Sequence, residues 1–254
     1  ENKIPIILLH GFGASCLHWR YNSSYFAKKG FAVYSLDLIG FGNSSQPGIK
    51  EIGKLDNGVW SEQVEDFINQ IIRPKNSNKV ILIGNSLGAL VALTSAVYLT
   101  NEILAVIASP LPEALNFNKI TTKPKINLKK FKIKLIKLFF NILPLEIILF
   151  IVNKLKIIKL GLQGAYYKKD KVDIELLEII TKPVLRKTAA RALRAMCIGM
   201  SIREEKLKTS FLLESLNKSK KVPFLIIWGE KDNFIPLFLG KKIANFYRWV
   251  ELKI

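Results

Sequence analysis

The sequence predicts an α/β fold with a mostly parallel sheet, flanking helices and a helical cap inserted before the penultimate strand. Short apolar runs alternate along the chain with segments whose apolar residues recur at helical spacing, a pattern typical of parallel sheets. The alternation stops after Pro110 and resumes only at Val222. We therefore expect an α/β core of residues 1–110 and 221–254, and a helical, lysine-rich cap of residues 111–220.

Each element of this core follows from a local pattern. The predicted strands are residues 4–9, 31–36, 80–83, 103–108, 222–228 and 249–254. The predicted core helices are residues 25–29, 60–72, 87–99 and 239–246. Gly30 and Pro74 are expected to end the first two helices, because glycine and proline commonly follow a helix end.

Residues 79–89 carry the main functional motif. The apolar run of residues 80–83 leads directly into Gly84-Asn85-Ser86-Leu87-Gly88 and then into good helix formers. A strand that turns sharply into a helix at such a sequence lifts the serine hydroxyl clear of the sheet, and the crowded turn requires small flanking residues. The Gly-x-Ser-x-Gly pattern alone occurs in roughly one chain in ten of this length, but its strand–turn–helix context makes Ser86 a candidate nucleophile.

The charge is unevenly distributed. The net charge is +19, and residues 119–169 contain thirteen lysines and a single acidic residue, Glu146. No nucleic-acid-binding motif accompanies this charge, so no nucleic-acid partner is predicted, and an AT-rich genome would also favour the many Lys, Ile and Asn residues. Leu128, Phe131, Leu135, Leu138 and Phe139 lie at helical spacing between the lysines. They form either a surface for peripheral association with anionic membranes or a cap face that packs on the core.

Other site classes receive little support from the sequence. Cys16 and Cys197 are not in a metal or redox spacing, so we expect two reduced thiols in a cytoplasmic protein. No metal, nucleotide or other cofactor is predicted. The most apolar stretch, residues 135–152, is interrupted by polar residues and a proline, so no membrane-spanning helix is expected. The oligomeric state cannot be predicted.

Four motifs occur in order: HGFGAS at residues 10–15, DLIGFGNS at 37–44, GNSLGA at 84–89 and WGEKDNFIP at 228–236. Together they resemble the α/β-hydrolase superfamily everywhere outside the predicted cap. The resemblance implies Ser86 as the nucleophile, Asp232 as the acid of a catalytic triad, and the backbone N–H groups of Phe12 and Leu87 as an oxyanion hole. It also implies a structural role for Asp37.

The histidine that should serve as the general base is missing from its expected position. A histidine should follow Asp232, but the only histidines are His10 and His18. His10 belongs to a dipeptide that is usually structural in the family, and His18 lies in no motif. We therefore expect the catalytic histidine beyond Ile254, and the alternative is a relative that has lost the reaction.

Within the superfamily, HGFGASCLHWR, FAVYSLDLIGFGNSSQP and GNSLGA are similar to the plant and cyanobacterial branch of pheophytinase and chlorophyll dephytylase-like hydrolases. The resemblance implies a serine hydrolase that cleaves a small but bulky apolar ester, such as a phytylated chlorophyll derivative, at a thylakoid surface in a photosynthetic organism. The alternatives are a broad carboxylesterase or lipase, a carbon–carbon bond hydrolase, and a non-catalytic binding protein.

Overall fold

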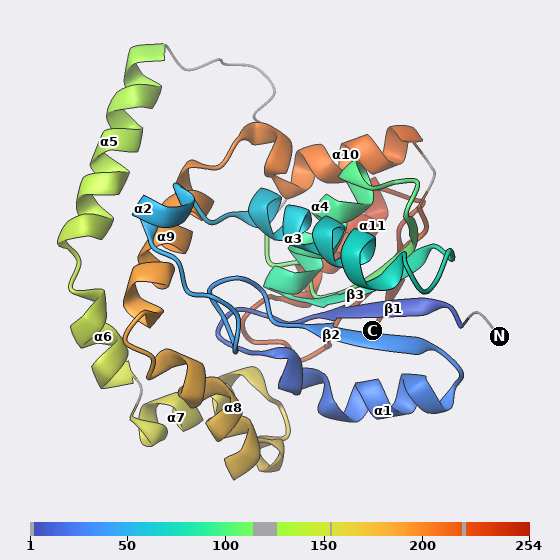
Figure 1. Cartoon of the computed structure of the whole chain (residues 1–254), viewed down its shortest axis with the longest axis horizontal. Coiled ribbons are helices and arrows are strands. Elements are labelled where there is room, and N and C mark those ends of the chain that lie inside the picture. The colour runs from blue at the N-terminus through green and yellow to red at the C-terminus, as the bar shows by residue number, and fades with distance from the viewer. Residues whose placement is uncertain (1–2, 114–125, 153, 220–221) are drawn as a thin grey trace.

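The computed structural model describes residues 3–113, 126–152, 154–219 and 222–254 (Figure 1). Within these residues, six parallel strands form one sheet in the order β2-β1-β3-β4-β5-β6. The strands are β1 (Pro5–Leu9), β2 (Ala32–Leu36), β3 (Val80–Asn85), β4 (Ile103–Ser109), β5 (Phe224–Ile227) and β6 (Glu251–Lys253). The predicted fold class is confirmed.

The strand order reverses direction between β1 and β3. After β1 the chain adds β2 on one side, and from β3 onward it adds strands on the other side. Connections that leave in opposite directions open a crevice at the carboxyl ends of the two central strands, and ligands of parallel sheets bind there. The loop after β1 contains Phe12 and the turn after β3 contains Ser86, so both lie at this crevice.

Helices cover both faces of the sheet (Figure 1). The helices are α1 (Arg20–Lys28), α2 (Ile49–Ile52), α3 (Asn57–Phe67), α4 (Leu87–Tyr98), α5 (Ile126–Ile142), α6 (Leu145–Val152), α7 (Leu155–Ala165), α8 (Ile174–Val184), α9 (Ala189–Ile202), α10 (Thr209–Ser219) and α11 (Leu237–Phe246). The helix expected at residues 25–29 begins earlier, at Arg20, and the helix expected at residues 60–72 ends in a π-helical turn, Ile68–Ile72. The last strand is shorter than expected.

The main core lies between the sheet and the α3–α4–α10 layer. Trp60 of α3 is fully buried there, and its indole N–H donates to the carbonyl of Ile39 at 2.8 Å. A smaller cluster on the opposite face joins Ile6, Leu8 and Ile83 to α1. Because strands β1 and β3 are covered on both faces, the ends that carry the crevice are held rigidly.

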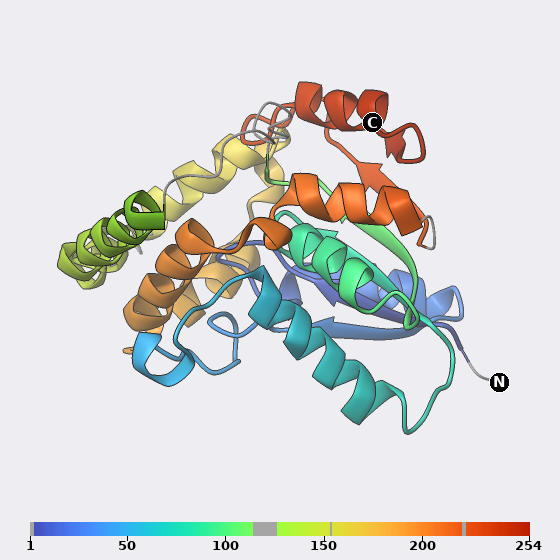
Figure 2. The ribbon, with the colours of Figure 1, turned by 90° about the horizontal axis from the view of Figure 1, so that it is seen from above.

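Helices α5 to α10 all lie between β4 and β5 in the sequence. Figure 2 shows α5 at the outer edge of the molecule, whereas α10 packs on α4. The α10 residues Leu212, Leu213 and Leu216 belong to the main core. The division of the chain into a core and a cap at residues 111–220 stays a prediction, although α10 packs with the helices of the core.

Candidate active site

Ser86 occupies a strained position between β3 and α4. Its φ of 49° and ψ of −110° make it the one non-glycine residue with positive φ in the described part of the chain. Its backbone N–H donates to the carbonyl of Ser109 at the end of β4, at 3.1 Å. Such backbone conformations persist only where the surroundings enforce them, and they cluster at functional sites.

The glycines beside Ser86 are required by close backbone packing. A Cβ on Gly84 would overlap the carbonyl of Gly88, and a Cβ on Gly88 would overlap the carbonyl of Leu9 at the end of β1. The prediction that the turn accepts only small residues at these positions is confirmed. The second overlap also shows that α4 begins directly against the end of β1.

The loop that contains Phe12 lies against the Ser86 turn. Gly11 to Ala14 form a turn closed by an Ala14 N–H to Gly11 carbonyl bond of 3.2 Å, with Gly13 at φ 72°. A Cβ on Gly11 would meet the side-chain oxygen of Asn85, the residue before Ser86, at 2.5 Å.

Leu87 is the first residue of α4. The first N–H groups of a helix have no partner within it and carry partial positive charge. The structure thus brings the two predicted oxyanion-hole segments together beside Ser86.

Asp232 lies in the loop after β5. Its Oδ1 accepts two backbone bonds of 2.9 Å, from Phe234 and Ile235. Among the described residues, Oδ2 receives no hydrogen bond and is the oxygen open to a further donor. Since β4 lies between β3 and β5, the ends that carry Ser86 and Asp232 are about 10 Å apart at the usual strand spacing. A third group must connect the two side chains.

Neither histidine of the chain is in a position to connect them. The fully buried His10 contacts the carbonyl of Gly11 through Nδ1 at 2.8 Å, and its Nε2 accepts the backbone N–H of Leu38 at 3.1 Å. His18 contacts the hydroxyl of Tyr166 through Nε2 at 3.0 Å. Burial lowers the pKa of both imidazoles. Both rings have structural partners and are disfavoured as proton acceptors.

The carboxyl end of β6 lies beside that of β5. The Lys253 carbonyl accepts the Trp228 N–H at 2.9 Å, and β6 pairs with β5 in parallel register. A side chain directly after β6 would therefore emerge next to the Asp232 loop.

Asp37 holds the loop after β2. Its carboxylate accepts the backbone N–H groups of Cys16 at 2.6 Å and Asn43 at 2.8 Å. These are the contacts of a structural residue, as the resemblance implied. In the described part of the chain, no cluster of three or more His, Cys, Asp or Glu side chains is placed to hold a metal ion.

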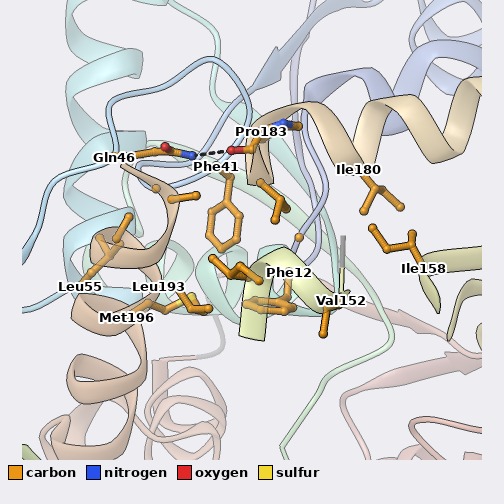
Figure 3. A pocket seen from close by; sticks show the side chains of 16 residues that line it. Phe12, Phe41, Gln46, Leu55, Val152, Ile158, Ile180, Pro183, Leu193 and Met196 are labelled. Carbon is orange, nitrogen blue, oxygen red and sulfur yellow. Dashed lines mark hydrogen bonds between the residues drawn. The ribbon is translucent and has the colours of Figure 1, made fainter. Parts of the chain in front are cut away.

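An apolar cavity of about 190 Å³ adjoins the Phe12 loop (Figure 3). Its wall comes from the loops after β1 and β2, from Leu55 between α2 and α3, and from helices α6 to α9, and Ser86 is not part of it. The lining residues are Phe12, Gly13, Gly40, Phe41, Gln46, Leu55, Leu149, Val152, Ile158, Ile180, Pro183, Val184, Ala189, Ala192, Leu193 and Met196. Phe12 thus belongs to both the predicted oxyanion hole and the cavity wall.

Three polar side chains hold α8 and α9 over this cavity. The Gln46 amide donates to the carbonyl of Pro183 at 3.1 Å (Figure 3). Arg186 donates to the carbonyls of Gly42 and Ser44, and Arg191 to that of Gln46. Sequence reasoning missed these residues. The sequence did contain an indication of the arginines, since four of the seven arginines of this lysine-rich chain lie in residues 186–203. The planar guanidinium group is suited to several hydrogen bonds at once.

Comparison with known proteins identifies the family. A sequence profile of the alpha/beta hydrolase fold family matches residues 4–131. The 1-acylglycerol-3-phosphate O-acyltransferase ABHD5 of Sus scrofa is 35% identical over 92 residues, which are 36% of this chain and 25% of that protein. Epoxide hydrolase 4 of Mus musculus is 22% identical over 261 residues, 98% of this chain and 66% of that protein. The matches therefore span between a quarter and two thirds of these relatives' lengths.

Solved structures show the same fold. A thermophilic esterase from Thermogutta terrifontis superposes with a TM-score of 0.67 at 18% identity, over 99% of this chain and 80% of that one. A probable hydrolytic enzyme from Pseudomonas aeruginosa superposes with a TM-score of 0.69 at 15% identity, over 99% and 78%. At these identities the likeness concerns the fold alone. The likeness to the pheophytinase branch stays a prediction.

Proposed function

The chain belongs to the alpha/beta hydrolase fold family, and on that premise we propose that it is a serine hydrolase that cleaves apolar carboxylic esters through an acyl-enzyme. The observation that carries the proposal is the strained Ser86 turn with the Phe12 loop packed against it. The family match and the alignment with epoxide hydrolase 4 over 98% of this chain agree with hydrolysis as the reaction class.

The reaction follows from this arrangement. The Ser86 hydroxyl attacks the ester carbonyl and passes its proton to a base, and the N–H groups of Phe12 and Leu87 stabilise the oxyanion. Loss of one such donor typically costs about 3–4 kcal/mol of transition-state stabilisation. The alcohol leaves with the proton as the carbon–oxygen bond breaks. Water, deprotonated by the same base, then attacks the acyl-enzyme and releases the acid.

The base in this proposal is a histidine that follows β6. The carboxyl end of β6 lies beside the Asp232 loop, and Oδ2 of Asp232 is open to a further donor. In that position Asp232 would orient the imidazole and balance its charge without becoming protonated.

The cavity favours the broad carboxylesterase among the alternatives. Its volume of about 190 Å³ is below the range of about 300–1,000 Å³ typical of sites that enclose a drug-sized ligand. A short or medium acyl chain fits, whereas a phytylated tetrapyrrole would require the helices to move apart. The narrower chlorophyll substrate therefore has the weaker support.

Serine chemistry also disfavours epoxide opening. Attack of a serine oxygen on an epoxide carbon would give an ether, which lacks the carbonyl carbon that water attacks in an acyl-enzyme. With Ser86 as nucleophile, an ester substrate completes the cycle and an epoxide substrate does not.

A fluorophosphonate probe tests the nucleophile. The full-length protein should be labelled at Ser86, the Ser86→Ala variant should not, and Ser109→Ala should be labelled like the wild type because only the backbone of Ser109 contacts the turn. Absence of labelling in the wild type would overturn the proposal in favour of a non-catalytic binding protein. Nitrophenyl esters of increasing chain length, compared with pheophytin, then define the substrate, and faster cleavage of pheophytin would refute the cavity argument.

A further inference from the structure

Helix α5 has two apolar faces on opposite sides. Ile133, Ile136 and Phe140 are partly covered on the side where α5 contacts α9. Successive helix residues are 100° apart, so Phe131, Leu135, Leu138, Phe139 and Ile142 form a second stripe centred on the opposite side. The side chains of this second stripe are between 49% and 71% exposed. Of the two interpretations open from the sequence, packing on the core is wrong for Phe131, Leu135, Leu138 and Phe139. The side chain of Leu128, which the sequence placed in the same stripe, lies outside the described residues.

Helix α6 repeats the arrangement. Its inner side carries the buried Leu145 and the cavity residues Leu149 and Val152. Its outer side carries Ile147, Phe150 and Ile151, which are 59%, 76% and 47% exposed. Figures 1 and 2 both show α5 and α6 at the edge of the molecule, away from the sheet. We call the exposed residues of the two helices, from Phe131 to Ile151, the outer apolar surface.

The area of this surface exceeds that of an ordinary apolar patch. Its eight side chains are on average more than half exposed, which amounts to roughly 900 Å² if a fully exposed large apolar residue presents close to 200 Å². The largest patch on a typical monomer is about 300–600 Å². The outer apolar surface is therefore expected to bind a partner.

The charges around it identify the partner. Lys132 and Lys134 lie on either side of the α5 stripe, and further exposed lysines follow α6 at Lys154, Lys156 and Lys159. The acidic residue of this region, Glu146, pairs with Arg194 at 3.1 Å, and this bond lowers its pKa. A second copy of so cationic a surface would be repelled, whereas lysines beside an apolar face suit an anionic lipid bilayer.

Arg194 of α9 fixes the two helices in a bent arrangement. It donates to the carbonyls of Phe140 and Leu143 at 2.9 and 3.2 Å, and through both terminal nitrogens to Glu146. No single described helix is long and apolar enough to cross a bilayer, although the Phe131–Ile142 part of α5 and helix α6 meet that test jointly, with a bend of 56°. Helix α6 is about 12 Å long, which is less than half the thickness of the hydrocarbon core of a bilayer. A position of α6 in the plane of the membrane therefore fits better than one across it.

We propose that the outer apolar surface docks the protein onto anionic bilayers. A further consequence rests on the proposed function: because α6 has its outer side in the bilayer and its inner side in the cavity wall, an apolar ester could pass from the bilayer to the cavity without crossing bulk water.

Sedimentation with vesicles tests the docking without reference to hydrolysis. The full-length protein should bind phosphatidylcholine vesicles that contain 30 mol% phosphatidylglycerol, and bind pure phosphatidylcholine much more weakly. Binding should fall between 50 and 500 mM NaCl because salt screens the lysines. The combined variant Phe131→Glu and Phe150→Glu should bind at least about a hundredfold more weakly, since burying each aromatic ring favours binding by roughly tenfold or more. Phe211→Glu on α10, also an exposed aromatic residue, should bind normally.

A second set of variants isolates the charge. Replacing Lys132, Lys134 and Lys154 by Gln should weaken binding to anionic vesicles about a hundredfold, at about fivefold per lysine. The same substitution at the exposed Lys28, Lys50 and Lys79 removes equal charge elsewhere and should have a small effect. The proposal would be overturned if the wild type did not bind vesicles, or if the two lysine variants bound equally well. It would also be overturned if the wild type were a dimer that the Phe131 and Phe150 substitutions dissociate. Cleavage of a soluble ester should not change in the docking variants, so loss of docking and loss of catalysis are separable.

Discussion

The strain at Ser86 makes a prediction about stability that is independent of any substrate. Replacing Ser86 by Gly removes the side chain that makes its φ of 49° unfavourable, while Ser86→Ala removes the hydroxyl and keeps the Cβ. The difference between the two variants therefore excludes the contribution of the hydroxyl, and it combines the backbone strain with the greater chain entropy that glycine loses on folding.

The magnitude can be estimated from two opposing terms. A residue held in such a conformation costs about 1–3 kcal/mol. Glycine loses more chain entropy on folding than alanine, at about 0.5–1 kcal/mol. We expect Ser86→Gly to be more stable than Ser86→Ala by about 1 kcal/mol, which corresponds to roughly 2–4 °C in Tm for a chain of this size.

Urea denaturation followed by circular dichroism, with thermal melts as a check, measures this difference. Both variants should be inactive toward the fluorophosphonate probe. If Ser86→Gly were less stable than Ser86→Ala by about 0.5–1 kcal/mol, the chain entropy of glycine would account for the whole difference. The turn would then not be strained, and the argument that it is maintained for function would fail.

Three further perturbations follow from the contacts described. Gly88→Ala should destabilise the fold by about 3 kcal/mol because its Cβ would overlap the backbone at the end of β1. Gly161→Ala, with open space around it in α7, should instead stabilise the fold by about 0.5–1 kcal/mol. Comparable chemical-denaturation midpoints for the two variants would contradict this. Because burial lowers the pKa of His10 and His18 below 6.5, the unfolded state binds protons that the folded state excludes. The free energy of unfolding should therefore fall as the pH drops below 6.5, by up to about 1.4 kcal/mol per pH unit for each histidine, and His18→Gln should reduce that slope. Burial raises the pKa of Cys16 to about 11. The rate at which iodoacetamide alkylates Cys16 should therefore keep rising up to about pH 11, about two pH units beyond a free thiol. A plateau of this rate near pH 9 would refute the shift.

Local patterns predicted the elements that depend on neighbouring residues. The apolar run of residues 80–83 and the glycines around Ser86 are adjacent in sequence, and the close approaches at Gly84 and Gly88 follow from the geometry of the turn. The order of the strands in the sheet could not be predicted in this way, because apolar runs do not indicate which strands pair. The placement of Phe12 came from a resemblance to a family and not from its own pattern.

The cavity and the outer apolar surface show a different limit. Helical spacing groups Phe131 with Leu135 and Leu138 on one face but does not say what that face contacts. A second, less regular set, including Ile133 and Phe140, is instead partly covered on the side where α5 contacts α9. The cavity depends on contacts between residues more than a hundred positions apart, such as Gln46 with Pro183, and no local pattern carries that information.

The pairing of β4 with β5 has a consequence for how this chain can vary. The two strands are neighbours in the sheet although roughly 110 residues separate them. The entropy of closing a loop rises only with the logarithm of its length, so a tenfold longer connection costs about 2 kcal/mol more. The helices of this connection can therefore change in length, charge and exposed surface while the strand ends that carry Ser86 and Asp232 keep their spacing. Such a chain can acquire a new docking surface without rebuilding its chemistry.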